Sequence, residues 1–200
     1  FALSGKEEPL ITHADHFMTN TAYGVASYTK GEVLLEQLRY IIGEKAFDEG
    51  MLTYFNTWKF KHPNPNDFFR VMEKVSGLEL DWFKEYFVHT THTIDYALGE
   101  MKGKTLIINR VGNMPMPLDV SVKTKDGKTL NFYIPLEMMR GEKTGDRFFN
   151  DFKVMKDWPW THKTYPLELG ISLKDIIEVT IDPSGRLADT NKNNNVFPRL

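Results

Sequence analysis

The stretch that decides the fold runs from Leu118 to Ile134 and reads LDVSVKTKDGKTLNFYI. Apolar and polar residues alternate on both sides of its centre, as they do in strands with one buried face. Asp126-Gly127 stands between the two alternating runs, and this dipeptide is typical of a tight hairpin turn. The stretch therefore predicts an antiparallel β-hairpin.

Further short runs surround this hairpin in the second part of the chain. Leu106–Ile108 precedes it, and the alternating residues of Ile177–Ile181 follow it and end at the turn sequence Asp182-Pro183-Ser184-Gly185. Short strands separated by Gly and Pro turns are typical of small antiparallel β-sandwiches. We expect such a β-sandwich domain over residues 93–200, with a polar C-terminal tail.

Before Thr93 the apolar residues recur at helical spacing instead. Four helices are expected there, over about Thr29–Ile42, Phe47–Trp58, Asn66–Ser76 and Asp81–Phe87. Asn66 and Asp81 are the expected caps of the last two, because their side chains accept hydrogen bonds from free amides at a helix start. The sequence thus predicts an α+β fold, with a helical domain over residues 1–92.

The start of the first helix is predicted from Thr29-Lys30-Gly31-Glu32, which fits the capping-box pattern. In that pattern the Thr hydroxyl and the Glu carboxylate satisfy amide donors at the helix start. Tyr28 would then stand just before the helix. From there it can pack as a staple against Val33, and the positive end of the helix would lie beside it.

Composition excludes several classes of function. Lys and Arg number 25 against 27 Asp and Glu, so the net charge of -2 disfavours a nucleic-acid partner. No apolar run is long enough for a transmembrane segment, and the absence of cysteine excludes disulfides and thiolate metal sites. None of these features indicates a cellular compartment.

Histidines and carboxylates give no defined site. His13 and His16 flank Asp15, and His89 and His92 have the same spacing, but neither pair is followed by a third ligand at a recognisable spacing. A metal site at His13 and His16 is a weaker hypothesis, and we assign no metal ligand in this chain. Glu7 and Glu8 are interpreted as solvated surface residues.

An ordered set of short motifs resembles the gluzincin zinc aminopeptidases, the family of aminopeptidase N and the leukotriene hydrolase type. The motifs are Tyr28-Thr29-Lys30-Gly31, Gly43-Glu44, the Ser76–Phe83 stretch, Leu106–Arg110 and Ile181–Gly185. The resemblance implies that residues 1–92 form the C-terminal helical portion of a thermolysin-like catalytic domain, followed by a β-sandwich. It also implies a peptide substrate cleaved at its amino-terminal bond.

The resemblance assigns roles to two tyrosines. Tyr28 stands where the family has its catalytic tyrosine, whose O–H stabilises the oxyanion of the transition state. Tyr23 matches a tyrosine that lines the substrate cleft in the family. The local sequence alone favours a different interpretation, in which the Tyr23 ring packs in an ordinary turn. The alternative for Tyr28 is the staple position described above.

The zinc ligands of the family are missing from this sequence, which contains no H-E-x-x-H motif. Because the chain also opens at Phe1 without an initiator Met, we expect a fragment whose parent holds zinc through upstream residues. The fragment alone should be inactive and should self-associate through apolar residues exposed by truncation, namely Phe68, Phe69, Trp82 or Phe83. The alternative is a non-catalytic binding module from a parent with a degenerate zinc site.

Overall fold

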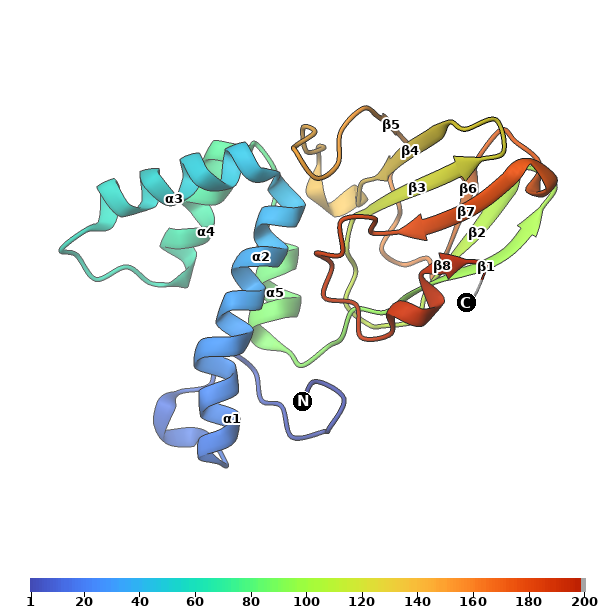
Figure 1. The fold of residues 1–200 in the computed structure, drawn as a ribbon. Coiled ribbons are helices and arrows are strands. Elements are labelled where there is room, and N and C mark those ends of the chain that lie inside the picture. Colours follow the sequence, from blue (N-terminus) through green and yellow to red (C-terminus); the bar gives the residue numbers. More distant parts are fainter. Residues whose placement is uncertain (199–200) are drawn as a thin grey trace. The chain divides into compact units, whose positions relative to one another are not determined.

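The computed structural model describes residues 1–198, and the chain divides by its contacts into two compact units (Figure 1). The helical unit comprises Phe1–His92 and Met138–Asp146, and the β unit comprises Thr93–Glu137 and the described residues from Arg147 onward. Helices and sheets are segregated along the chain, so the predicted α+β class is confirmed. The return of Met138–Asp146 to the helical unit was not predicted. Residues 199 and 200, at the end of the predicted second domain, lie outside the described residues.

The helical unit begins with a short 3₁₀ turn and continues through five α-helices and one π-helical stretch. In chain order these are η1 (Ala14–His16), α1 (Asn20–Gly24), the π-helical η2 (Val25–Lys30), α2 (Gly31–Ile42), α3 (Glu44–Trp58), α4 (Pro65–Ser76) and α5 (Asp81–His89). Gly43 and Gly77 follow α2 and α4 with positive φ angles, which glycine adopts without steric cost.

The cap of the first long helix lies ten residues earlier than predicted. α1, η2 and α2 follow one another without a break, and the cap is Thr19, whose side chain accepts a hydrogen bond from the Ala22 amide at 3.0 Å. Thr29 lies inside this helix, where the amides of the next turn bond to main-chain carbonyls. The prediction of a capping box at Thr29 and Glu32 was therefore wrong.

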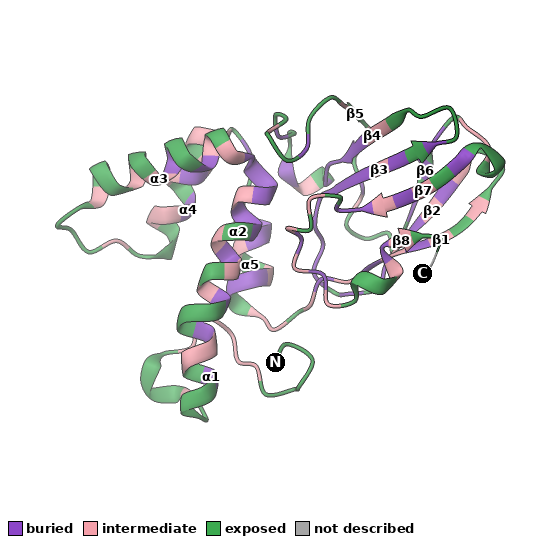
Figure 2. Ribbon diagram, viewed as in Figure 1, coloured by how far each residue is buried: buried purple, intermediate pink, exposed green. Residues whose placement is uncertain are grey.

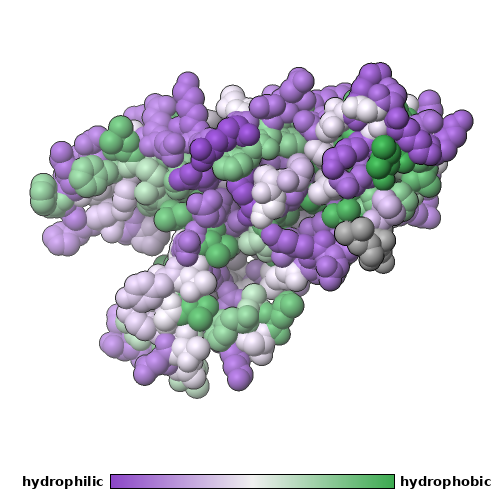
Figure 3. Space-filling model, viewed as in Figure 1, coloured by the Kyte–Doolittle hydropathy of each residue, from purple (hydrophilic) through white to green (hydrophobic). Residues whose placement is uncertain are grey.

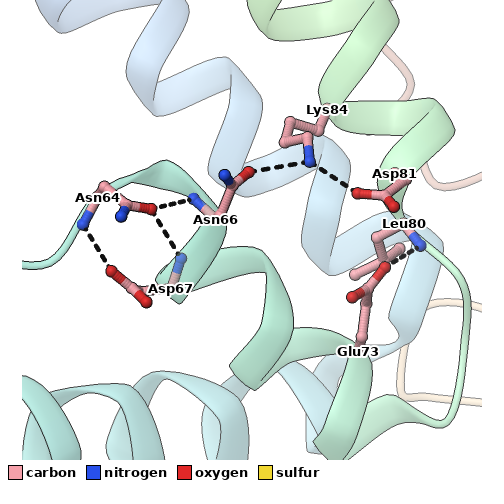
Figure 4. A network of polar contacts seen from close by, with 7 residues as sticks. All are labelled: Asn64, Asn66, Asp67, Glu73, Leu80, Asp81 and Lys84. Carbon is pink, nitrogen blue, oxygen red and sulfur yellow. Dashed lines mark hydrogen bonds and ion pairs between the residues drawn. The ribbon is translucent and has the colours of Figure 1, made fainter.

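Polar contacts at the starts of α4 and α5 also differ in detail from the prediction (Figure 4). Asn64, not Asn66, caps α4 and forms a reciprocal capping box with Asp67. Leu80 takes the cap position of α5, and its amide donates to the Glu73 carboxylate at 2.8 Å. Pro65 explains the first shift, because proline is preorganised for the first helical position and needs a cap before it.

The next residues in this network join α4 to α5. Lys84 donates to the Asn66 side chain at 3.0 Å and pairs with Asp81 at 2.7 Å (Figure 4). Asp81 lies in the first turn of α5, where a negative charge is favourable, but its side chain binds Lys84 instead of capping the helix.

Burial follows the predicted apolar faces of α2, α4 and α5 more closely than that of α3 (Figure 2). Phe69, Trp82 and Phe83 are buried, so three of the four aromatics that were expected to expose apolar surface do not. They are covered because their rings pack on one another across α4 and α5. Exposed apolar side chains instead follow α3, at Leu52, Phe55 and the residue Phe60 beyond it.

The β unit contains two sheets. One has the strand order β1 (Tyr96–Lys102), β2 (Thr105–Arg110) and β6 (Thr164–Glu168). The other has the order β5 (Phe152–Val154), β4 (Thr129–Ile134), β3 (Leu118–Thr124), β7 (Ile176–Ile181) and β8 (Val196–Phe197). The predicted hairpin is confirmed, with Leu118 paired to Ile134 across β3 and β4. β5 pairs with β4 in parallel, so the second sheet is not purely antiparallel as was expected.

The core of the β unit lies among inward-facing residues of both sheets. Val120, Val122, Phe132 and Ile134 are buried on β3 and β4, and Ile108 is buried on β2. Side chains from outside the strands complete this core: the Trp158 ring meets the Tyr96 ring edge-on at 5.6 Å. In the space-filling view, hydrophilic atoms cover much of the face shown, as expected for strands with one solvated side (Figure 3).

Among residues 1–198, no helix combines the length and the apolar character needed to cross a lipid bilayer.

Candidate functional site

The π-helical stretch η2 carries the first of the two candidate tyrosines. Tyr28 is the fourth of its six residues, and 74% of its surface is exposed. π-Helical turns are rare inside α-helices and are frequently found at functional sites. Its side chain is therefore presented outward from an unusual segment of backbone.

A cavity of about 820 Å³ lies beside this tyrosine in the helical unit. Tyr28, Thr29 and Glu32 belong to its wall. The rest of the lining is mainly apolar and comes largely from α2, α3, α4 and α5, with further residues from the N-terminal segment and the loop before α4. It includes Leu34, Leu35, Tyr54, Phe68, Phe69 and Val88. The phenol thus borders a concave apolar surface and is not sealed inside the helical core.

The position of the helix start changes the expected electrostatics of Tyr28. Free amides and their partial positive charge belong to the first turn of a helix, which begins after Thr19. Tyr28 lies more than two turns beyond that point. The prediction that the positive end of a helix lies beside Tyr28 was therefore wrong. The alternative, in which Tyr28 is a staple residue just before a helix, was wrong for the same reason. An exposed phenol at this place can donate a hydrogen bond to an oxygen atom of a ligand.

Tyr23 lies on α1 and is 40% exposed. Its ring meets Phe17 edge-on, with the ring centroids 5.5 Å apart. Tyr23 does not belong to the lining of the cavity beside Tyr28. The structure therefore does not bring the two candidate tyrosines into one cavity.

A buried ion pair at Lys30, two residues after Tyr28, was not predicted from the sequence. The Lys30 ammonium lies 2.7 Å from the Glu7 carboxylate, and each side chain is only 10% exposed. The same ammonium donates to the Thr90 carbonyl at 3.0 Å and lies 5.5 Å from the centre of the Phe87 ring. The interpretation of Glu7 as a solvated residue was wrong. Its partner lies 23 positions further along the chain, so no local pattern in the sequence links the two residues.

The histidines lie on the surface. All six are exposed, and the His13 and His16 rings are 5.3 Å apart, close to Asp15. Within the part of the chain that the structure describes, no group of three or more His, Cys, Asp or Glu side chains is arranged to hold a metal ion. The described residues therefore do not fit a zinc site by themselves.

Comparison with known proteins relates part of the chain to a peptidase family. Residues 3–87 match the model of a family described as the peptidase family M1 domain. Aminopeptidase N of Haemophilus influenzae is 25% identical over 122 residues, in an alignment that covers 54% of this chain. The chain spans 14% of the length of that relative. These matches confirm the resemblance that the order of the motifs indicated, and the family match includes Tyr23, Tyr28 and Lys30.

Proposed function

The helical part of this chain belongs to peptidase family M1, and from this premise we propose that the chain is part of a zinc-dependent aminopeptidase in which Tyr28 is a catalytic residue. The observation that supports it best is the coincidence of the family match with an exposed phenol at the wall of an apolar cavity. The substrate class is a peptide with a free amino terminus.

Tyr28 acts as a hydrogen-bond donor in this proposal. When the carbonyl of a peptide bond is attacked, negative charge grows on its oxygen. A phenolic O–H directed at that oxygen stabilises the transition state more than the bound substrate, and this difference accelerates the reaction. Tyr28 holds its own proton throughout and does not generate the nucleophile.

Zinc would activate the attacking water in such an enzyme. Since the described residues do not fit a zinc site and the sequence lacks H-E-x-x-H, we assign the zinc ligands to a part of the parent protein beyond these 200 residues. The aminopeptidase of Haemophilus influenzae, of which this chain spans 14%, is long enough to contain such a part. The 200-residue chain alone should then hydrolyse no peptide.

The two parts of the chain have different roles in the proposal. In this proposal the helical unit is the C-terminal helical portion of the catalytic domain, and the β unit is a β-sandwich that follows it. Tyr23 is a substrate contact at most, because it lies outside the cavity wall. Self-association of the isolated chain stays a prediction, with the exposed apolar residues of α3 as its surface.

The test is the substitution Tyr28→Phe in the full-length protein, assayed with amino-acid p-nitroanilides. Loss of one oxyanion donor should lower kcat by roughly 10²–10³-fold and change KM much less. Tyr86→Phe is the matched control, because it removes a phenol on α5 that does not line the cavity. Unchanged turnover in the Tyr28 variant would refute the assignment. Absence of hydrolysis by the unmodified full-length protein would favour the binding module instead.

A further inference from the structure

We propose that Lys30 is a positioning residue for Tyr28, acting through its buried ion pair with Glu7 and its hydrogen bond to the Thr90 carbonyl. This inference rests on the proposed function, because it gives Tyr28 a catalytic role. It concerns residues that do not line the cavity themselves.

Burying the Lys30 ammonium has a cost in free energy. Its ammonium is charged and strongly hydrated in water, and taking it out of water is unfavourable unless a partner replaces the hydration shell. Here the Glu7 carboxylate lies at 2.7 Å and the Thr90 carbonyl at 3.0 Å, and the Phe87 ring contacts the same ammonium. The charge is thus fixed at one place, which an exposed lysine side chain would not be.

The helix turns Lys30 and Tyr28 to different faces. Each residue of an α-helix advances the side chain by about 100°, and a wider π-helical turn advances it by somewhat less, so two positions bring it to roughly the opposite face in either case. The structure agrees with this: Lys30 is 9% exposed, whereas Tyr28 is 74% exposed. Fixing the Lys30 side chain inward therefore fixes the rotation of the helix that presents Tyr28 outward.

Lys30 also joins three segments that are distant in sequence. Glu7 belongs to the N-terminal segment, Lys30 ends η2, and Thr90 follows α5. A second contact, from the Ile11 amide to the Val88 carbonyl at 3.1 Å, holds the N-terminal segment against the end of α5. η2 is thereby tied to two other segments of the chain at Lys30, the residue where it meets α2.

The backbone of η2 depends on these contacts as well. A π-helical stretch is rarely stable by local interactions alone, so contacts from the surrounding structure must select it. Lys30 is the last residue of the stretch and the one with a buried charge. Without its partners, a rearrangement of η2 toward ordinary α-helix would turn Tyr28 about the helix axis. A displacement of about 1 Å at a reacting group can cost a hundredfold in rate.

The test is a double-mutant cycle in the full-length protein, with Lys30→Met measured in the unmodified and in the Tyr28→Phe background. We expect Lys30→Met to lower kcat about ten- to a hundredfold with Tyr28 present, and less than threefold when Tyr28 is Phe. Lys30→Arg keeps the charge and should restore most of the activity. Lys45→Met, an exposed lysine on α3, is the control and should change kcat less than twofold.

The outcomes separate the two proposals. If Tyr28→Phe leaves kcat unchanged, the proposed function fails and the positioning role fails with it. If Tyr28→Phe lowers kcat but Lys30→Met lowers it by the same factor in both backgrounds, only the positioning role is overturned, because Lys30 then acts on the fold and not through Tyr28. Glu7→Gln, a milder change, should show the same dependence on Tyr28 and covers the case in which Lys30→Met does not fold.

Discussion

The buried ion pair between Glu7 and Lys30 allows a quantitative prediction of stability. Removing one partner leaves the other charge in a site where each side chain is 10% exposed. Breaking such a pair typically costs about 3 kcal/mol, because the remaining charge loses its ionic partner in a site where little water can replace it. We expect Glu7→Met and Lys30→Met each to reduce the free energy of local unfolding by about this amount.

The double variant should behave differently from the sum of the single ones. Two methionines leave no uncompensated charge, and they fill a similar volume with apolar atoms. The Thr90 carbonyl still loses its donor, which costs about 1–2 kcal/mol. The double variant should therefore lose less stability than either single variant.

Hydrogen exchange followed by mass spectrometry measures this effect locally, which suits a chain with two compact units. Peptides that cover residues 7–12, 25–32 and 86–90 report on the three segments that Lys30 joins. A loss of about 3 kcal/mol corresponds to roughly a hundredfold faster exchange.

An exposed pair of nearly the same length provides the control. Lys123 and Glu178 lie 2.8 Å apart on β3 and β7, with their side chains 57% and 35% exposed. Glu178→Gln should change exchange in these strands by less than about fivefold, since exposed pairs contribute at most about 1 kcal/mol. If the Glu7 and Lys30 variants change exchange no more than this control, or if their effects simply add, the reasoning from burial is wrong.

Two further predictions concern the β unit. The Tyr96 hydroxyl donates a hydrogen bond to the Met116 carbonyl at 3.1 Å and accepts one from the Met116 amide at 2.7 Å, and both residues are buried. Tyr96→Phe should therefore lower the free energy of unfolding, measured by urea denaturation, by about 2 kcal/mol. A loss below about 0.5 kcal/mol would contradict this. Hydrogen bonds from Lys128 and then Thr124 lower the pKa of Asp126 from 3.8 to about 2. The hairpin should therefore keep this stabilisation above about pH 4 and lose it as the pH falls through about 2. An NMR titration of the Asp126 carboxyl measures this, and a midpoint near pH 4 would show that the contacts with Lys128 and Thr124 are absent.

The parts of the fold that the sequence predicted well depend on local patterns. The hairpin of β3 and β4 combines alternating residues with a turn at Asp126-Gly127, and Gly127 has the positive φ that this turn needs. Gly43 and Gly77 also have positive φ angles, and they follow the last residues of α2 and α4. By contrast, β5 and β8 have three and two residues, too few for an alternating pattern, and the rest of the sheet determines their pairing.

Helix starts show where local patterns mislead. Thr29-x-x-Glu32 and Asn66 both satisfy the rules for caps, yet the chain uses Thr19 and Asn64. A cap forms only where the preceding residue leaves the helix, and at Thr29 the backbone stays helical through Tyr28 and Lys30. Whether a helix continues depends on how its preceding turns pack. Here the turns before Thr29 are packed through two buried alanines, Ala22 on α1 and Ala26 on η2.

The candidate site was predictable only in part. Tyr28 was found through the order of several short motifs, since a single exposed tyrosine carries no pattern of its own. Its surroundings were not found, because Glu7 and Thr90 lie 23 and 60 positions from Lys30. No periodicity in the sequence relates residues at such separations, and only the folded chain brings them together.

The early helix start also decides how Tyr28 can contribute to catalysis. A phenol at a helix amino end would be helped by the free amides there, whatever its exact direction. Tyr28 lies well inside a continuous helix, and the amides around it are engaged in main-chain bonds. Any stabilisation that it provides must therefore come from the direction of its own O–H, and a directional hydrogen bond weakens steeply when the donor turns away. A fixed anchor two residues along the helix, with its charge buried against Glu7, meets this requirement more directly than any field from the helix itself.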